Sequence, residues 1–482
     1  MMTKFKSKWM VIALCFVVLG CKSSKTALQD ETYKQGKDYI PTAYNAAQTQ
    51  DTNTIAAKNF KAVFSDIHLT TLIDSALHNN QELNITMQEI EVAKSEVRAK
   101  KGEYLPTGGL QLGAGLDKSA EFTRNGAVES QLHVMEDKKF PEPLGDFMVG
   151  AHFSWEVDIW RKMRNSKNAA LSRYLGTIEG RNFMVTNLVS EIAENYYKLL
   201  ALDEQLTIVN HFIDIQEDVL EIVQQQKDAA KVTELAVNRF EAQLLKTKNM
   251  QYSIKQSVVE TENTINFLVG RFPQPVERDI TSFHSTILDT IVTGSPEQLL
   301  SYRPDIRKAE RDLVAAKYDV KAAKAAFYPS LGISANVGMQ AFNPAVWFNP
   351  KSLLYNLLGD LFAPLINRNA IRAQYNASKA KQSQALVDYQ QKILKAFIEI
   401  NNQLAMVKNF SESLQTKTKE VDILNQSVDI SNDLFMSARA DYMEVLLTQK
   451  EALDAKMELI ETILKEKEAK IGIYRALGGG WK

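Results

Sequence analysis

Apolar residues recur at alternating steps of three and four over two long stretches of the chain. Those of the first stretch are Val237, Phe240, Leu244, Ile254, Val258, Ile265 and Leu268, and those of the second are Leu446, Leu453, Met457, Ile460, Leu464, Ile471 and Tyr474. Polar residues interrupt both patterns, notably Thr247 in the first and Lys450 and Lys467 in the second. A period of 3.5 residues predicts long helices that wind around one another with a left-handed twist.

Proline and glycine, which destabilise helix interiors, are missing from the same stretches. No proline occurs from Leu144 to Phe272, and no glycine from Arg181 to Val269 or from Asp360 to Ile471. Because a helical proline costs about 3 kcal/mol and a glycine about 1 kcal/mol, these gaps predict uninterrupted helices. A helix of about 70 residues would extend for about 100 Å. A soluble helical bundle would show the same pattern, so the helices alone do not determine the class of protein.

Three shorter segments alternate between apolar residues and small or polar ones, which is the period of a β-strand. Their apolar members are Leu110, Leu112, Ala114 and Leu116; Phe147, Val149, Ala151, Phe153, Trp155 and Val157; and Leu331, Ile333, Ala335, Val337 and Met339. A tilted membrane-spanning strand needs about 9–11 residues, which matches these lengths. The apolar side chains would then face lipid and the others a lumen. A strand of a soluble sandwich is the alternative.

The chain contains the same unit twice. Residues 223 positions apart match, among them Ala93 with Ala316 and Pro106 with Pro329. We therefore expect a first repeat at 61–270, a linker at 271–298 and a second repeat at 299–482, each repeat with a helix, a strand pair and long helices. The two strand pairs give four strands per chain. Four strands cannot close a barrel, and an open sheet edge is not tolerated in hydrocarbon. Several chains must therefore combine.

The N-terminus reads as a secretory signal. Three lysines precede an apolar run from Trp9 to Leu19, which is too short to span a membrane as a helix. Gly20-Cys21 after this run resembles a lipoprotein cleavage site, so we expect a signal peptide at 1–20, a covalent lipid on Cys21 and an anchored N-terminal arm at 21–60. An ordinary signal peptide with a chance cysteine is the alternative. Only Cys21 would remain after cleavage, so no disulfide is expected.

Charge and motif content argue against nucleic-acid binding and catalysis. The formal net charge is -1, so nothing in the overall balance favours nucleic acid. The histidines are not spaced as metal ligands with one another or with a cysteine, no serine lies in a nucleophile elbow, and Gly478-Gly479-Gly480 fits a helix stop better than a phosphate loop. The histidines, expected at surface or lumen positions, are His68, His78, His133, His152, His211 and His284. We predict no enzyme activity, no metal and no cofactor other than the lipid.

The chain resembles the outer-membrane factor family, the TolC-like exit ducts, and in particular its lipoprotein branch associated with multidrug efflux. The resemblance spans nearly all of the mature chain. Its most specific stretch runs from Tyr302 to Glu310, followed by Tyr328-Pro329-Ser330-Leu331. Supporting matches are Phe64, Asp66, Leu69, Leu72, Ile73, Ala76, Leu77, Asn80, Ala363-Pro364-Leu365 and the closing Ala476-Leu477-Gly478-Gly479.

The resemblance implies a mainly α-helical fold with membrane β-strands. Three chains would close a 12-stranded β-barrel, with four transmembrane strands from each, continuous with a long coiled-coil barrel of helices in the periplasm. The homotrimer would sit in the outer membrane, anchored by its lipids, and dock onto a periplasmic adaptor and an inner-membrane pump of the RND type. Its function would be to conduct small molecules passively to the outside.

Two turns between long helices, at Asp228 to Leu235 and at Ser437 to Val445, match the family's periplasmic tips. As gate residues we predict Asp441, Tyr442, Thr233 and Glu234, and as adaptor contacts Ala230, Lys231, Ala438 and Arg439. Ala230 and Ala438 depart from the family, in which glycine is common at these positions. Asn367-Arg368-Asn369 likewise stands where glycine usually follows the second strand pair. A solvated aspartate at a helix start is the alternative for Asp441.

Three further segments have predicted places. We expect residues 117–143 to form a polar loop facing outside the cell, and Phe342, Trp347 and Phe348 to form part of an interfacial girdle. Arg303-Pro304-Asp305 fits the start of a helix better than a catalytic pair. An outer-membrane duct for type I protein secretion and a lipid-anchored coiled-coil scaffold are the alternative functions. The substrate, the pump and the adaptor are not determined by the sequence.

Overall fold

The computed structural model describes residues 36–44, 54–135, 138–139, 141–285, 287, 292–437 and 439–481. The signal peptide, Cys21 and Ala438 lie outside these ranges. By contacts the chain divides into two units, one of residues 1–91, 175–311 and 386–482 and one of residues 92–174 and 312–385. Each unit draws on both halves of the sequence, so the two predicted repeats are not separate compact bodies.

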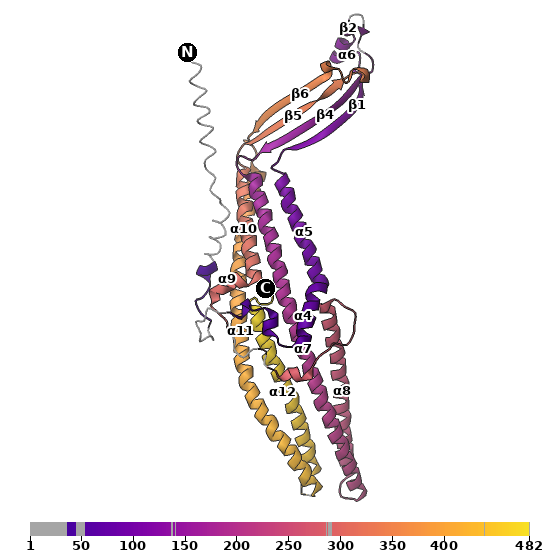
Figure 1. The fold of residues 1–482 in the computed structure, drawn as a ribbon, viewed down its shortest axis with the longest axis vertical. Helices are drawn as coiled ribbons and strands as arrows, with labels where there is room; N and C mark the ends of the chain where they lie inside the picture. The colour runs from indigo at the N-terminus through magenta and orange to yellow at the C-terminus, as the bar shows by residue number, and fades with distance from the viewer. Residues whose placement is uncertain are drawn as a thin grey trace. The chain divides into compact units, whose positions relative to one another are not determined.

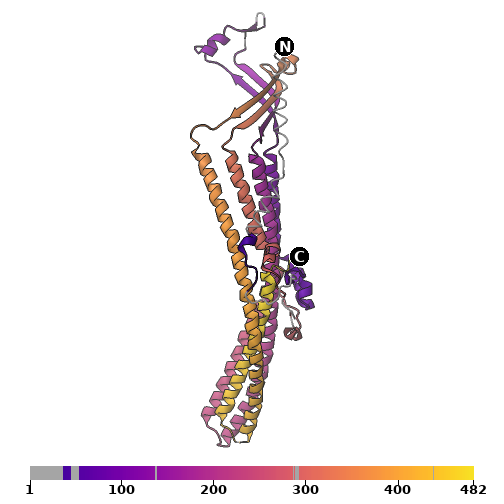
Figure 2. The same ribbon diagram turned by 90° about the vertical axis from the view of Figure 1, so that its left-hand side faces the viewer.

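The first unit is built around two helical hairpins, of which residues 162–174 and 369–385 belong to the second unit. Helix α7 (Lys162–Asp228) turns into α8 (Glu234–Val269), and α11 (Asn369–Met436) turns into α12 (Tyr442–Ala476). Within this unit the hairpins lie side by side in both ribbon views (Figures 1 and 2). Shorter helices accompany them: η1 (Ile55–Ala57), α3 (Phe60–Val63), α4 (Ile67–Asn79), η2 (Ile280–His284), η3 (Pro296–Gln298) and α9 (Leu299–Tyr302).

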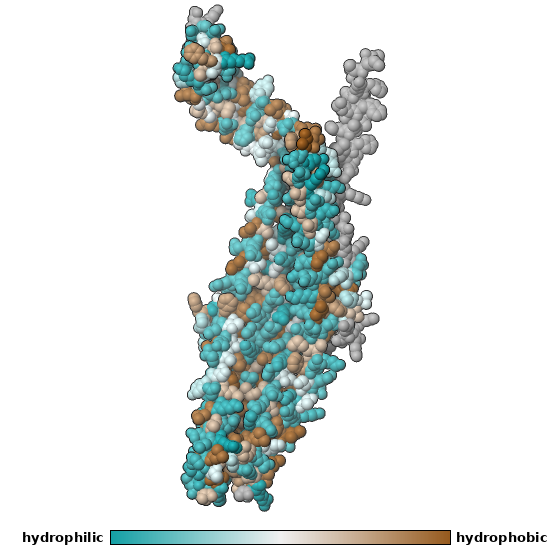
Figure 3. Space-filling view, turned by 180° about the vertical axis from the view of Figure 1, so that it is seen from behind, coloured by the Kyte–Doolittle hydropathy of each residue, from teal (hydrophilic) through white to brown (hydrophobic). Residues whose placement is uncertain are grey.

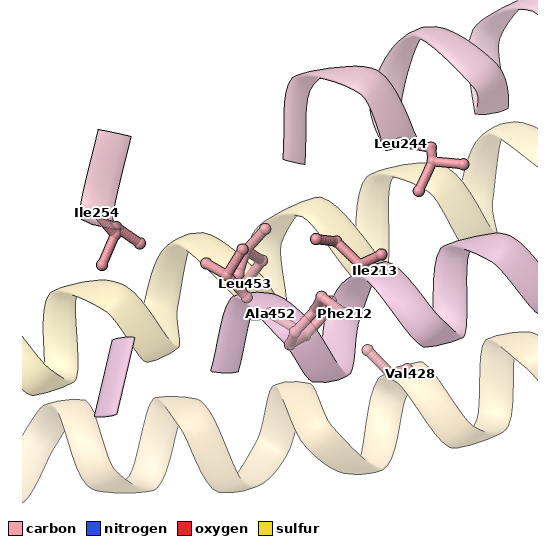
Figure 4. Close-up of a cluster of buried hydrophobic side chains, with 8 residues drawn as sticks. Phe212, Ile213, Leu244, Ile254, Val428, Ala452 and Leu453 are labelled. Carbon is pink, nitrogen blue, oxygen red and sulfur yellow. The ribbon is translucent and has the colours of Figure 1, made fainter. Parts of the chain in front are cut away.

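Apolar side chains from all four long helices join the hairpins. Figure 4 shows Phe212 of α7 and Leu244 of α8 beside Val428 of α11 and Leu453 of α12 in one buried cluster. Over the helices, the face seen in Figure 3 is mainly hydrophilic, with hydrophobic residues in small separate groups. The 3.5-residue pattern therefore marks the seams between helices. In the described part of the chain, no helix has both the length and the apolar character needed to cross a membrane.

The predicted seam is correct in α8 but shifted at the start of α12. In α8 all the predicted apolar positions are buried except Val258, which is half-buried. In α12 the fully buried residues of the first turns are Val445, Gln449 and Ala452, whereas Leu446 is half-buried. The seam therefore begins one residue earlier than predicted.

The second unit contains a four-stranded antiparallel sheet of order β1-β4-β5-β6. Its strands are β1 (Thr107–Asp117), β4 (Leu144–Val157), β5 (Ser330–Ala341) and β6 (Leu353–Phe362). Two helices precede them, α5 (Gln81–Gly102) before β1 and α10 (Pro304–Ala325) before β5. The elements α5, β1, β4, α7 and α8 thus recur in order as α10, β5, β6, α11 and α12.

The apolar residues of the strands are in register across the sheet. Leu112 pairs with Val149, Val149 with Met339, and Met339 with Leu353. The predicted alternation therefore produces one continuous apolar face. Several of its side chains are exposed, with Leu110 90% and Tyr355 80% accessible.

The predicted outer loop has structure of its own. It holds α6 (Arg124–Glu129) and a small sheet of β2 (His133–Met135) and β3 (Lys138–Lys139), and η4 (Pro344–Val346) and η5 (Pro350–Ser352) lie between β5 and β6. The aromatics predicted for a girdle lie beside this end of the sheet. Trp347 contacts Phe147 and Phe348, with ring centroids 6.4 and 6.0 Å apart, and Phe348 is exposed.

Two predicted helix boundaries are confirmed. Pro304 begins α10, with Asp305 in its first turn. Gly478 follows the end of α12 with φ +85°, and its N–H donates to the Arg475 carbonyl. A left-handed residue after a helix is typical of glycine, so the closing glycines are a helix stop.

Lys467 is a buried cation on the seam of α12. Its side chain is covered by the Tyr197 and Phe283 rings, and its Nζ donates to the Ser285 carbonyl at 2.6 Å. Burial lowers the pKa of Lys467 to about 8, with neighbouring Lys470 adding to the shift and Glu466 opposing it.

This pKa predicts a specific dependence of stability on pH. Between about pH 8 and 10, the folded chain carries Lys467 mostly neutral while the unfolded chain still binds the proton. The unfolded state then binds more protons, so this group makes the free energy of unfolding rise with pH, by at most about 1.4 kcal/mol per unit. Denaturant titrations at pH 7 to 10 should show that Lys467→Met removes this rise. An identical pH profile in the variant would contradict the assignment.

Candidate functional site

The two hairpin tips share an apolar base. Val223 of α7 and Phe240 of α8 are buried in one cluster with Phe435 of α11 and Val445 of α12. Beyond this base, toward the ends of the hairpins, the chain reverses between α7 and α8 and between α11 and α12. The described structure thus brings the two predicted tips together at one end of the first unit.

The four predicted gate residues lie at the starts of the returning helices. Thr233 is the N-cap of α8 and Asp441 the N-cap of α12, and neither side chain accepts a capping hydrogen bond. Both side chains are exposed. Glu234 pairs with Lys227 across the first turn at 2.5 Å, whereas Tyr442 is half-buried against the apolar base. Asp441 therefore presents a carboxylate to solvent, while Tyr442 also has a packing role.

The predicted adaptor contacts that the structure describes, Ala230, Lys231 and Arg439, are all exposed. At the first tip, the N–H of Lys231 donates to the Gln226 carbonyl and that of Ala230 to the Lys227 carbonyl. These two bonds form a Schellman motif. At the second tip, the N–H of Arg439 donates to the Leu434 carbonyl over the same sequence separation.

Ala230 occupies a backbone conformation that favours glycine. Its φ is +54°, and a non-glycine residue there costs roughly 1–2 kcal/mol. We expect Ala230→Gly to raise the free energy of unfolding by about 0.5–1 kcal/mol, since glycine removes this cost but adds freedom to the unfolded chain.

Denaturant unfolding of the purified protein tests this prediction. Ala229→Gly is the matched control, because Ala229 is also exposed but does not have positive φ, and it should not stabilise the chain. Equal effects of the two substitutions would show that backbone strain at Ala230 is not the cause.

Sequence reasoning missed two clusters of buried or half-buried charges in the first unit. Arg278 of the linker region binds Asp203 and Glu262, both at 2.5 Å, and Arg303 binds Asp305 and Glu399, both at 2.8 Å. Apart from Asp305, the partners lie 16 to 96 residues away in sequence, so no local pattern signals them. Lys467 did carry a signal, because a lysine on an apolar seam must be buried or displaced.

No three histidine, cysteine, aspartate or glutamate side chains of the described residues are grouped to hold a metal ion. Five of the histidines are exposed and His68 is half-buried, as expected for surface or lumen positions.

Two helical hairpins and a four-stranded sheet built from a duplicated strand pair define the class of an outer-membrane channel protomer. The family model described as "Outer membrane efflux protein" matches residues 72–271 and 295–479. The chain belongs to this family, and the resemblance found in its sequence is confirmed.

Relatives match over almost the whole chain. The pyoverdine export outer membrane protein OpmQ of Pseudomonas aeruginosa is 27% identical, covering 98% of this chain and 96% of the relative. The probable outer membrane lipoprotein SilC of Salmonella typhimurium is 24% identical, covering 99% of each chain. The crystal structure of the open state of the Neisseria gonorrhoeae MtrE outer membrane channel superposes with a TM-score of 0.82 at 19% identity, over 92% of this chain and 96% of that one. The likeness to MtrE shows the fold and confirms the predicted fold class.

Proposed function

We propose that this chain is the outer-membrane exit duct of a tripartite efflux system. Three copies would close a 12-stranded barrel, and their helical hairpins would continue it into the periplasm. The duct would conduct small molecules passively, passed on by a periplasmic adaptor and an inner-membrane pump of the RND type. The relatives cited above support export, since one is named for pyoverdine export and the family for efflux.

The sheet is the observation that carries this proposal. In the described residues, β1 and β6 each pair on one side only, and the apolar face between them is largely exposed. Such a face is stable in lipid, but unpaired N–H and C=O groups are not. Pairing β1 of one copy with β6 of the next satisfies both requirements.

Disulfide cross-linking between copies tests the proposed pairing. Gln111→Cys on β1 would be combined in turn with Leu354→Cys, Asn356→Cys or Leu358→Cys on β6, since the register between copies is to be found. We expect one combination to give covalent dimers and trimers on a non-reducing gel of purified membranes.

The matched control places both cysteines within one chain. Met148 and Gln340 are direct partners on β4 and β5, so Met148→Cys with Gln340→Cys should remain monomeric. The native Cys21 alone gives the background. Monomers from every β1–β6 combination would defeat the trimeric barrel.

The tips are the proposed gate and docking site. Adaptor binding would favour a splayed arrangement of the tip helices over the packed one, because the adaptor would have a higher affinity for the splayed tips. Three copies of exposed Asp441 would form an acidic ring that attracts cations. We expect Asp441→Ala to lower the cation selectivity of reconstituted channels, measured as a reversal potential across a salt gradient. Unchanged selectivity would remove Asp441 from the gate.

Anchoring completes the proposal. A lipid on Cys21 would hold the N-terminal arm at the periplasmic surface of the outer membrane. The relative SilC is itself named a probable lipoprotein. Mass spectrometry of the mature N-terminus would detect the acyl groups directly.

A further inference from the structure

Both returns from a strand to a long helix have the same design. After β4, Ile159 and Trp160 are each 47% exposed, and Arg161 follows with φ +60°. After β6, Leu365 and Ile366 are 82% and 90% exposed, and Asn367 follows with φ +51°. Each return thus presents an exposed apolar pair, then a left-handed residue, and then the start of a helix.

Both returns carry surplus positive charge, but they differ in the ion pairing of their cations. At the first, Lys162 pairs with Glu156 at 2.8 Å and Arg164 with Asp158 at 3.1 Å, so two of its three cations are paired with carboxylates locally, and Arg161 adds one positive charge. At the second, Asp360 near the end of β6 is the last carboxylate, and residues 361–387 contain no aspartate or glutamate, although Arg368 and Arg372 lie there. The second return therefore carries surplus positive charge beside its apolar pair.

Packing fixes one of these charges, that of Arg368, in position. The Arg368 guanidinium lies over the Phe327 ring, 5.0 Å from its centroid, and donates to the Phe327 carbonyl at 2.9 Å. Arg372 is one turn further along α11 and is exposed. Lys324, exposed near the end of α10, adds a third cation in the same region. Arginine is suited to such a place because its fork of donors binds phosphate oxygens in pairs.

The sheet indicates what the return meets. β1 and β5 begin, and β4 and β6 end, at the same end of the sheet. All four connections to helices therefore lie at this end (Figure 1). Figure 3 shows hydrophobic residues gathered where the sheet gives way to helices, with hydrophilic residues directly beyond them. An apolar band followed by cations is the arrangement of a membrane–water interface.

We propose that the second return, residues 363–372, binds anionic phospholipid headgroups of the periplasmic leaflet. Leu365 and Ile366 enter the boundary of the acyl chains, and Arg368 and Arg372 bind the phosphates. The inference rests on the proposed function, because it requires the sheet to lie in the outer membrane. It adds a lipid preference that the channel function does not need.

Lipid retention by the purified protein tests this proposal. Trimers reconstituted in nanodiscs of phosphatidylglycerol and phosphatidylcholine would be partly delipidated, and the retained lipids measured by mass spectrometry. We expect the wild type to retain phosphatidylglycerol above its share of the mixture. Arg368→Gln and Arg372→Gln should each lower this enrichment roughly fivefold, because one cation near an anionic membrane surface contributes about 1 kcal/mol to binding. Added salt should weaken the enrichment in the wild type.

Lys379→Gln with Lys381→Gln is the matched control. It removes two positive charges from α11, one more than either arginine variant, but Lys379 lies about 10 Å beyond Arg372 along the helix, so the enrichment should persist. The proposal would be overturned if the wild type retained the two lipids in the ratio of the mixture, or if the control lost as much phosphatidylglycerol enrichment as the arginine variants. So would unchanged enrichment with altered ion selectivity in the arginine variants, because that result would place the arginines in the duct. Failure to form trimers at all would instead count against the proposed function.

Discussion

Replacing Arg303 with methionine should lower the free energy of unfolding by about 3 kcal/mol. Arg303 is 5% exposed and donates to both oxygens of Asp305, to Glu399 and to the carbonyl of Ala476. The substitution leaves two carboxylates without their cation and an acceptor without its donor. Removing one partner of a buried ion pair typically costs about 3–5 kcal/mol, and the lower end applies because Glu399 is partly exposed.

Arg173→Met is the matched control for this measurement. Arg173 pairs with Asp319, but both side chains are substantially exposed, and such pairs contribute about 0–1 kcal/mol. Denaturant unfolding should therefore show a clearly larger loss of unfolding free energy for Arg303→Met than for Arg173→Met. Adding Glu399→Gln to Arg303→Met should restore part of the loss. Equal losses in the two single variants would show that burial of Arg303 is not what matters.

Arginine at Val149 or Phe153 should destabilise the membrane-inserted protein by about 2–4 kcal/mol near mid-bilayer. Both residues lie on the apolar face of β4, where Val149 pairs with Leu112 and Met339. A charged group on this face would meet hydrocarbon, in which its hydration is lost. The measurement is the folding equilibrium in lipid vesicles under denaturant.

His152→Arg provides the control from the other face of the same strand. His152 is exposed and lies between the two apolar positions in sequence, so its side chain points away from the apolar face. Its replacement should cost little, since a lumen-facing cation stays in water. If Val149→Arg and His152→Arg were equally tolerated, the assignment of the faces would be wrong.

The sequence predicted the elements well because their signals are local. The absence of proline and glycine marked the two helical stretches but not the turns that divide them into α7 and α8 and into α11 and α12, and alternation marked β1, β4 and β5. The repeat followed from side-by-side comparison of the halves. The seam of α12 was placed one residue late at Val445, because Leu446 and Val445 are both apolar and only packing selects between them.

The candidate site was predicted only in outline. The positions of the tips followed from the resemblance to the family, whereas the positive φ of Ala230 was indicated only by the glycine that is common there in the family. The roles of Asp441 and Arg439 remain predictions, as does the lipid on Cys21. The cationic return at Arg368 was noticed in the sequence only as a departure from glycine.

The sequence by itself determined the long helices, the alternating strands, their duplication and the family, because each is written as spacing along the chain. The tertiary structure decided which charges are buried together, such as Arg303 with Glu399, and that the apolar residues of four strands form one face. It also decided that the two halves share their compact units. The physical reason is distance: burial and register depend on residues that are far apart in the chain and become neighbours only on folding.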